Sequence, residues 1–236
     1  MSNLIAIDIK GPVNFACSVA MGSRQVLRLL NGACLWFQEI AQKTSFTALG
    51  YELDVKALST NLLKPLDNQI YIIKALNEVL DFPEKCLARA FTIEGIRHAV
   101  KTASDSFASL RCLAMFGVIV LTPYTRGLGL AKNFLGATAA LLDLVMRVRD
   151  LVKLVYRPIK SEEELQKARF EWLGHMLMVV AYVCTLQLNF FGGCKSLFKD
   201  VIEPKKHMPG LFFNIWGTGA SVCILGNMAV DYFSPR

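Results

Sequence analysis

The sequence predicts an all-α fold: a helical integral membrane protein with N-terminal amphipathic helices and a C-terminal transmembrane hairpin. Residues 172–193 and 207–230 carry no formal charge. Each run is long enough to cross the roughly 30 Å hydrocarbon core of a bilayer, because a helix rises about 1.5 Å per residue. The composition agrees, since 53% of the residues are hydrophobic and only 19% are charged, whereas soluble domains carry roughly a quarter charged residues.

The alternative is that the two uncharged runs are buried helices of a soluble core. Such helices are usually shorter and amphipathic, which favours the membrane interpretation. The net charge of +7 suggests an acidic surface as partner, and in a chain this apolar we expect anionic lipid rather than nucleic acid. The runs do contain polar side chains, namely His175, Gln187, Asn189, Asn214 and Asn227.

Residues 1–105 are predicted to form an amphipathic helical region that mainly faces the cytosol. The first helix runs from Ser23, a possible N-cap, to Gln42, and it carries apolar residues at three- and four-residue spacing opposite basic ones. We expect this helix to contact a membrane surface through four of its residues, Arg24, Arg28, Leu30 and Phe37.

Two further amphipathic helices are expected in this region, at residues 55–80 and 83–98. Pro65 should break or kink the first of them. Two arrangements are open for the three helices. They could form a bundle that buries their apolar stripes against one another, or one stripe could insert into a membrane surface. Strand-like alternation is scarce throughout the sequence.

Residues 106–236 are predicted to form the membrane region. Pro123 interrupts the apolar residues 107–146, which could form either a pair of segments embedded in the membrane or part of a helical core. A basic amphipathic helix follows at residues 144–160, and its cations suit an anionic headgroup layer. The cations expected to bind that layer are Arg149, Lys153, Arg157 and Lys160.

The last part of the sequence predicts the helix starts and the topology of the hairpin. Ser161 and Glu164 have the spacing of a capping box at the start of the first spanning helix. More basic residues precede the hairpin than lie in its loop, which favours cytosolic flanks and hence two cytosolic termini. Gly217 and Ser221 form a small-xxx-small step that predicts a helix-packing surface.

No residue pattern indicates catalysis, a cofactor or a metal site. The three histidines are far apart without metal-ligand spacing, and the sequence has no glycine-rich phosphate-binding motif. The seven cysteines include no C-x-x-C pair and are expected to be free thiols. We therefore expect a protein that is not an enzyme and that holds neither a cofactor nor a metal ion.

Three segments carry a family resemblance. Residues 22–37 contain a basic V-L-R-L-L stretch that leads into small and aromatic residues, residues 134–154 pass from apolar to basic, and residues 198–228 join an Asp-Val-x-x-Pro stretch to a glycine-rich run. In this order they resemble the peroxin-11 family of peroxisomal and glycosomal membrane proteins. The Arg-Lys dipeptide usual in the second helix of that family is absent, because residues 64–74 read KPLDNQIYIIK.

The resemblance implies a multi-pass protein of the peroxisomal or glycosomal membrane, with both termini in the cytosol. Such a protein promotes elongation, proliferation and division of the organelle through insertion of an amphipathic helix. We expect as partners anionic lipid, further copies of the chain and the organelle fission machinery. One alternative is a channel or transporter-like protein, in which Gln187, Asn189, Asn214 and Asn227 would line a path. Another is a bacterial protein that a pathogen inserts in a host vacuole membrane.

Overall fold

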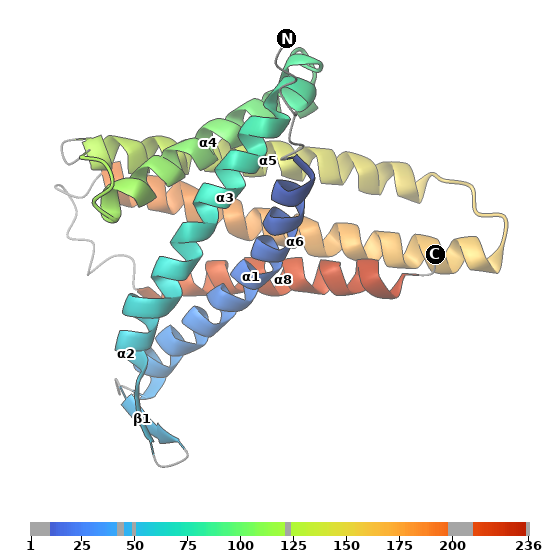
Figure 1. The fold of residues 1–236 in the computed structure, drawn as a ribbon. Helices are drawn as coiled ribbons and strands as arrows, with labels where there is room; N and C mark the ends of the chain where they lie inside the picture. The colour runs from blue at the N-terminus through green and yellow to red at the C-terminus, as the bar shows by residue number, and fades with distance from the viewer. Residues whose placement is uncertain (1–9, 42–44, 49–50, 121–123, 198–209, 235–236) are drawn as a thin grey trace, which may run out of the picture.

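The computed structural model describes residues 10–41, 45–48, 51–120, 124–197 and 210–234 and confirms the all-α class (Figure 1). Six long helices make up most of the described chain. They are α1 (Lys10–Ala41), α3 (Lys64–Phe82), α4 (Ile93–Met115), α5 (Thr125–Val155), α6 (Glu162–Leu197) and α8 (Gly210–Phe233). The shorter elements are β1 (Ser45–Ala48), β2 (Tyr51–Asp54), α2 (Val55–Ala57) and the π-helical segments η1 (Leu58–Leu63) and η2 (Pro83–Leu87).

Each long helix packs chiefly against two others, and together these contacts form a closed cycle. Its order is α1, α3, α4, α5, α6, α8 and back to α1. The helices α5, α6 and α8 run alongside one another as a layer, and α1 and α3 cross this layer obliquely (Figure 1). The division expected between residues 105 and 106 falls inside α4, and the first helix contacts the last.

The first helix is longer than predicted, because α1 already begins at Lys10. Ser23 is therefore an interior residue and not an N-cap, and its hydroxyl donates to the carbonyl oxygen of Val19, one turn earlier. A polar side chain that bonds back to its own helix in this way does not end the helix.

The predicted second helix corresponds to α2, η1 and α3, which follow one another without a gap. It starts at Asp54, whose carboxylate accepts a hydrogen bond from the backbone NH of Ala57 (2.9 Å). Pro65 does not end the helical stretch, because α3 continues directly from η1 across it. The segment before it, η1, has the wider π-helical hydrogen-bond pattern.

The predicted third helix is divided into two elements. Residues 83–87 form η2, residues 88–92 form a turn, and α4 starts only at Ile93. Thr92 is the N-cap, since its hydroxyl accepts from the backbone NH of Gly95 (3.1 Å). The antiparallel hairpin of β1 and β2, in which Ser45 pairs with Asp54, was not predicted.

The predicted break at Pro123 lies outside the described residues, in the segment between α4 and α5. Helix α4 ends at Met115, followed by Gly117 with a φ of 72°, a left-handed conformation that favours glycine. Residues 144–155 are then the last turns of α5 rather than a separate basic helix. Half of the predicted capping box is present, since Ser161 Oγ accepts from the NH of Glu164 (3.2 Å). The Glu164 carboxylate accepts from the NH of Lys160 (2.8 Å), one residue before the N-cap.

Polar and apolar residues are distributed in an unusual way among the described helices. Apolar side chains are exposed on every long helix, for example Leu30, Leu76, Ile96, Val148, Val180 and Val222. Buried positions hold many polar side chains, including Arg24, Gln25, Glu78, Asp81, Thr102, Asp105, Asp143, Asn214 and Ser221. The buried apolar residues are mostly alanine and cysteine, and small residues of this kind permit close helix contacts.

Two of the described helices are long and apolar enough to cross a membrane, over Arg126–Val155 and Glu162–Cys194. In their most apolar windows only 22% and 17% of the residues are buried. The second helix contains the predicted span 172–193. The predicted span 207–230 corresponds to α8, which is not one of these two helices, and residues 207–209 lie outside the described residues.

Candidate functional site

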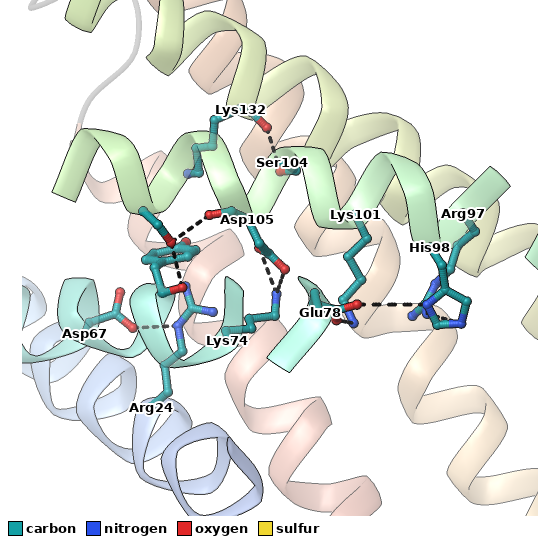
Figure 2. Close-up of polar contacts among 12 residues, drawn as sticks. Arg24, Asp67, Lys74, Glu78, Arg97, His98, Lys101, Ser104, Asp105 and Lys132 are labelled. Carbon is teal, nitrogen blue, oxygen red and sulfur yellow. Dashed lines mark hydrogen bonds and ion pairs between the residues drawn. The ribbon is translucent and has the colours of Figure 1, made fainter. Parts of the chain in front are cut away.

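The candidate site is a network of charged side chains between α1, α3, α4 and α5 (Figure 2). At its first contact, Arg24 and Arg28 of α1 both donate from Nε to Oδ1 of Asp67 on α3, at 2.7 and 3.3 Å. Arg24 also lies 4.0 Å from the centre of the Tyr71 ring, and Arg28 donates to the Tyr71 hydroxyl (3.4 Å). The two arginines lie four residues apart on α1, and Asp67 and Tyr71 lie four residues apart on α3. Each pair therefore shares one face of its helix, and the two faces meet.

The second contact joins α3 to α4. Lys74 Nζ lies 2.7 Å from Oδ2 of Asp105, and Lys101 Nζ lies 2.5 Å from Oε1 of Glu78. Each helix carries a cation followed by an anion four residues later. The two facing segments run in opposite directions, so each cation meets the carboxylate of the other helix. The hydroxyl of Ser109 adds a hydrogen bond to the backbone carbonyl of Tyr71 (2.8 Å).

The third contact joins α4 to α5. Arg97 Nε donates to Oδ1 of Asp143 (2.7 Å), and the Ser104 hydroxyl donates to the backbone carbonyl of Lys132 (3.0 Å). Both groups of the Arg97 and Asp143 pair are mostly buried. Removing one partner from a buried pair leaves an uncompensated charge, which is far more costly than losing a surface pair. The network therefore fixes the order and the register of four helices.

The charges around Tyr71 shift the pKa of its phenol. Burial alone raises this pKa, but the positive charges of Arg24, Lys132 and Arg28 outweigh burial and lower it to about 7. Burial likewise raises the pKa of Asp67, and the two arginines bring it below its usual value. The site is thus strongly electropositive next to an ionisable tyrosine.

The predicted membrane contacts of α1 are divided between the inside and the outside of the fold. Arg24 is buried and Arg28 lies between helices, so both face the network and not the surface. Leu30 is 51% exposed and Val26 is 48% exposed, while Phe37 is partly exposed. The helix therefore directs its basic side inward and its apolar stripe outward.

The basic residues predicted to bind a headgroup layer lie at the far end of α5 and just after it. Arg149 lies 3.7 Å from a carboxylate oxygen of Glu94, and Arg157 donates to Glu171 (3.2 Å). Lys153 and Lys160 are exposed. Exposed ion pairs of this type contribute little to stability, so these cations remain accessible to an anionic surface.

Several asparagines of the predicted spans lie against glycines of a neighbouring helix. Asn214 donates to the carbonyl oxygen of Gly32 (3.0 Å). A Cβ placed on Gly174 would lie 2.9 Å from Asn227 Oδ1, and one on Gly136 would lie 3.1 Å from Asn189. Asn214 and Asn189 therefore occupy close helix contacts, whereas Asn227 also lines a cavity of about 190 Å³.

Of the two residues predicted to form a helix-packing surface on α8, Gly217 and Ser221, only Ser221 is buried. Ser221 is fully buried, and its hydroxyl donates to the carbonyl of Gly217 (3.1 Å). A Cβ on Gly217 would have open space among the described residues, so the close contacts of α8 lie elsewhere. Gly219, for example, faces the thiol of Cys184 on α6.

The charged network itself was not predicted. Its sequence signal is the pair of opposite charges at four-residue spacing in residues 74–78 and again in residues 101–105. Such a pattern normally indicates a solvated helix face, and no local feature shows that the two faces meet. Among the described residues, no group of three or more His, Cys, Asp or Glu side chains could hold a metal ion.

Comparison of the chain with models of known protein families, with curated proteins and with solved structures finds no match.

Proposed function

We propose that this protein is an integral protein of a peroxisomal or glycosomal membrane that promotes elongation and division of the organelle. The observation that carries the proposal is the orientation of α1. Its arginines are paired inside the fold with Asp67, while Val26 and Leu30 form part of an apolar stripe on the outside. Water would not favour this arrangement, because it exposes apolar surface and buries charge, but a lipid surface would.

In this proposal α5 and α6 span the bilayer. Their apolar windows are mostly unburied, whereas the core helix of a soluble protein would be mostly buried. The loop between them carries Arg157 and Lys160, which favours its location on the cytosolic side. The end of α8 lies at the same end of the layer, because Asp231 and Ser234 share a cavity of about 190 Å³ with Arg147. The C-terminal end of α8 is thus cytosolic as well.

The charged network gives α1 its role in this proposal. Ion pairs connect α1 to α3, α3 to α4 and α4 to α5. A helix held obliquely to the spans by such pairs can insert its apolar stripe about 5–10 Å into one leaflet, which spreads the headgroups there and favours curvature. When several copies of the chain insert into the same leaflet, their contributions to membrane curvature add.

The test replaces Val26 and Leu30 by aspartate, which puts two charges on the exposed stripe and leaves the ion pairs intact. Overexpressed wild-type protein should produce elongated or more numerous organelles, and the double variant should not. The matched control is Leu53→Asp, an exposed apolar residue of β2. All three proteins must remain in the membrane pellet after alkaline carbonate extraction. A membrane-integrated double variant that remodels the organelle like the wild type would contradict the proposal.

A second candidate is a transporter-like protein, and the buried charges favour it. Ionisable residues inside membrane proteins are expensive and commonly belong to ion or substrate pathways. The relevant residues here are those of the network, Lys74 and Asp105 among them, because the asparagines of α6 and α8 pack against glycines. The test measures solute flux into proteoliposomes that contain the protein. A change in this flux in a Lys74→Met, Asp105→Leu double variant would favour the candidate. Flux through the wild type no greater than that in protein-free liposomes would exclude it.

A further inference from the structure

A cavity of about 150 Å³ lies between α3, α4 and α5, beside the charged network. Its polar lining comes from all three helices: Asn68 and Tyr71 on α3, Arg111 on α4 and Lys132 on α5. At one side the lining includes Met115, which is 63% exposed, and Arg111 is exposed as well. The cavity is therefore open to the surroundings of the protein at that side.

The described residues that line this cavity include two cations and no carboxylate. The nearest acidic residues of the network are already paired, Asp67 with two arginines and Asp105 with Lys74. Among the described residues, neither Arg111 nor Lys132 has a carboxylate at ion-pair distance. No described carboxylate therefore neutralises the positive charge of Arg111 and Lys132, and the only anion among the described residues at the cavity is the ionised form of Tyr71.

The groups in the cavity match the chemistry of a phosphate group. A guanidinium donates in a planar fork and an ammonium is a compact point charge, and both bind phosphate oxygens well. The Asn68 amide can donate a further hydrogen bond. A planar carboxylate would be satisfied by the guanidinium alone, whereas donors on three helices suit the tetrahedral arrangement of phosphate oxygens.

We propose that the cavity between α3, α4 and α5 is a binding site for a phosphate group, with Arg111 and Lys132 as its principal ligands. Two sources share this chemistry, a free phosphate compound and the headgroup of an anionic phospholipid. The exposed side chains of Met115 and Leu110 beside Arg111 offer apolar surface to the acyl chains of such a lipid. The site is independent of the proposed role of α1, since none of its four polar residues lies on that helix.

The test uses the full chain purified in nanodiscs of neutral phosphatidylcholine, with inorganic phosphate as the probe in calorimetric titrations. Arg111→Gln and Lys132→Gln should each weaken binding by about tenfold or more, because each removes a charge-assisted contact. The matched control is Lys153→Gln, which removes an exposed lysine of the same helix α5 outside this cavity and should leave the affinity within about twofold. Equal affinity in all four proteins would overturn the proposal, whereas a wild type that binds no free phosphate leaves the lipid headgroup as the ligand to be tested.

A second measurement on the wild type does not depend on the folding of any variant. Acylation of lysines by a water-soluble reagent, read by mass spectrometry, should be slowed at Lys132 by phosphate and unchanged at Lys153. Protection by inorganic phosphate in neutral nanodiscs identifies a free phosphate compound as a ligand. Protection only after phosphatidic acid is added to the nanodiscs identifies a lipid headgroup. Unprotected Lys132 in both conditions would contradict the site.

Discussion

At the scale of single residues, Tyr71 has the most altered chemistry. Arg24 and Arg28 on α1 and Lys132 on α5 face its ring or its hydroxyl, and Asp67 offsets only part of their charge. The phenol is therefore as sensitive to pH as a histidine usually is. Ionised Tyr71 supplies an anion where the three cations converge, so Tyr71 belongs to the charged network.

We predict that one tyrosine ionises near neutral pH. The pKa of Tyr71 is lowered to about 7 from the ordinary value of 10.0, so its ionised form stabilises the fold as the pH rises from about 7 to 10. Tyrosinate absorbance of the wild type should show a step near pH 7 that is lost in Tyr71→Phe. Tyr232→Phe, which removes an exposed tyrosine, serves as the control and should retain the step. A wild type without the step would contradict this prediction.

The buried pair of Lys74 and Asp105 gives a second prediction at this scale. Asp105→Leu should lower the free energy of unfolding by about 3–5 kcal/mol, because it leaves the Lys74 ammonium buried without its partner. Adding Lys74→Met should recover most of this loss, since an apolar pair replaces both charges. Thermal unfolding in detergent would measure both effects. A double variant as unstable as Asp105→Leu would show that the charge itself is not the cause.

At the scale of helices, close contacts depend on glycines at particular crossings. A Cβ on Gly32 of α1 would lie 2.5 Å from Thr218 Oγ1 and 3.2 Å from Asn214 Oδ1 of α8. On Gly217, one residue before Thr218, a Cβ would meet nothing within 4 Å among the described residues. Two glycines near the same crossing thus have different roles.

This difference gives a matched pair of substitutions. Gly32→Ala should destabilise the protein by about 1–3 kcal/mol, because the added methyl group forces α1 and α8 apart. Gly217→Ala should be neutral or stabilising by up to about 1 kcal/mol, since alanine is the better helix former and has space. The unfolding temperatures of the two variants in detergent would separate these expectations, and equal changes would show that neither glycine determines the crossing.

The sequence predicted those features of the helices that depend on local signals. The N-cap hydrogen bond of Ser161 has its signal within four residues, and an apolar run of spanning length lies inside α6. The early start of α1 was missed, since no sharp N-terminal signal marks Lys10. The hairpin of β1 and β2 was missed because strands of four residues are too short for a clear alternation.

The candidate site was missed for a different reason. Periodicity divides a helix into a polar and an apolar face, but it does not show which face is buried. For α1 we expected Arg24 and Arg28 at the surface, and the structure pairs them with Asp67 inside. That choice depends on the charges of α3, which lie about 40 residues away in sequence. Contacts over such distances leave no local pattern.

At the scale of the whole molecule, the exposed apolar surface predicts firm membrane association. Val180 is exposed on α6, one of the two helices long and apolar enough to cross a membrane. Val180→Asp should reduce insertion, because a carboxylate near the centre of a spanning helix costs about 3 kcal/mol. After carbonate extraction the wild type and Leu53→Asp should remain in the pellet, and Val180→Asp should appear in part in the supernatant. Release of the wild type itself would exclude an integral membrane protein.

The closed order of the six helices also constrains how the protein is made. The amide of Asn214 in α8 bonds to Gly32 in α1, so the two contacting residues are 182 positions apart in the chain. At a synthesis rate of 5–20 residues per second, α1 waits about 10–40 s before α8 exists. During that time its apolar stripe and its α8-facing side both lack their final surroundings. We therefore expect a nascent chain of this protein to contact a chaperone or a membrane before its last helix emerges.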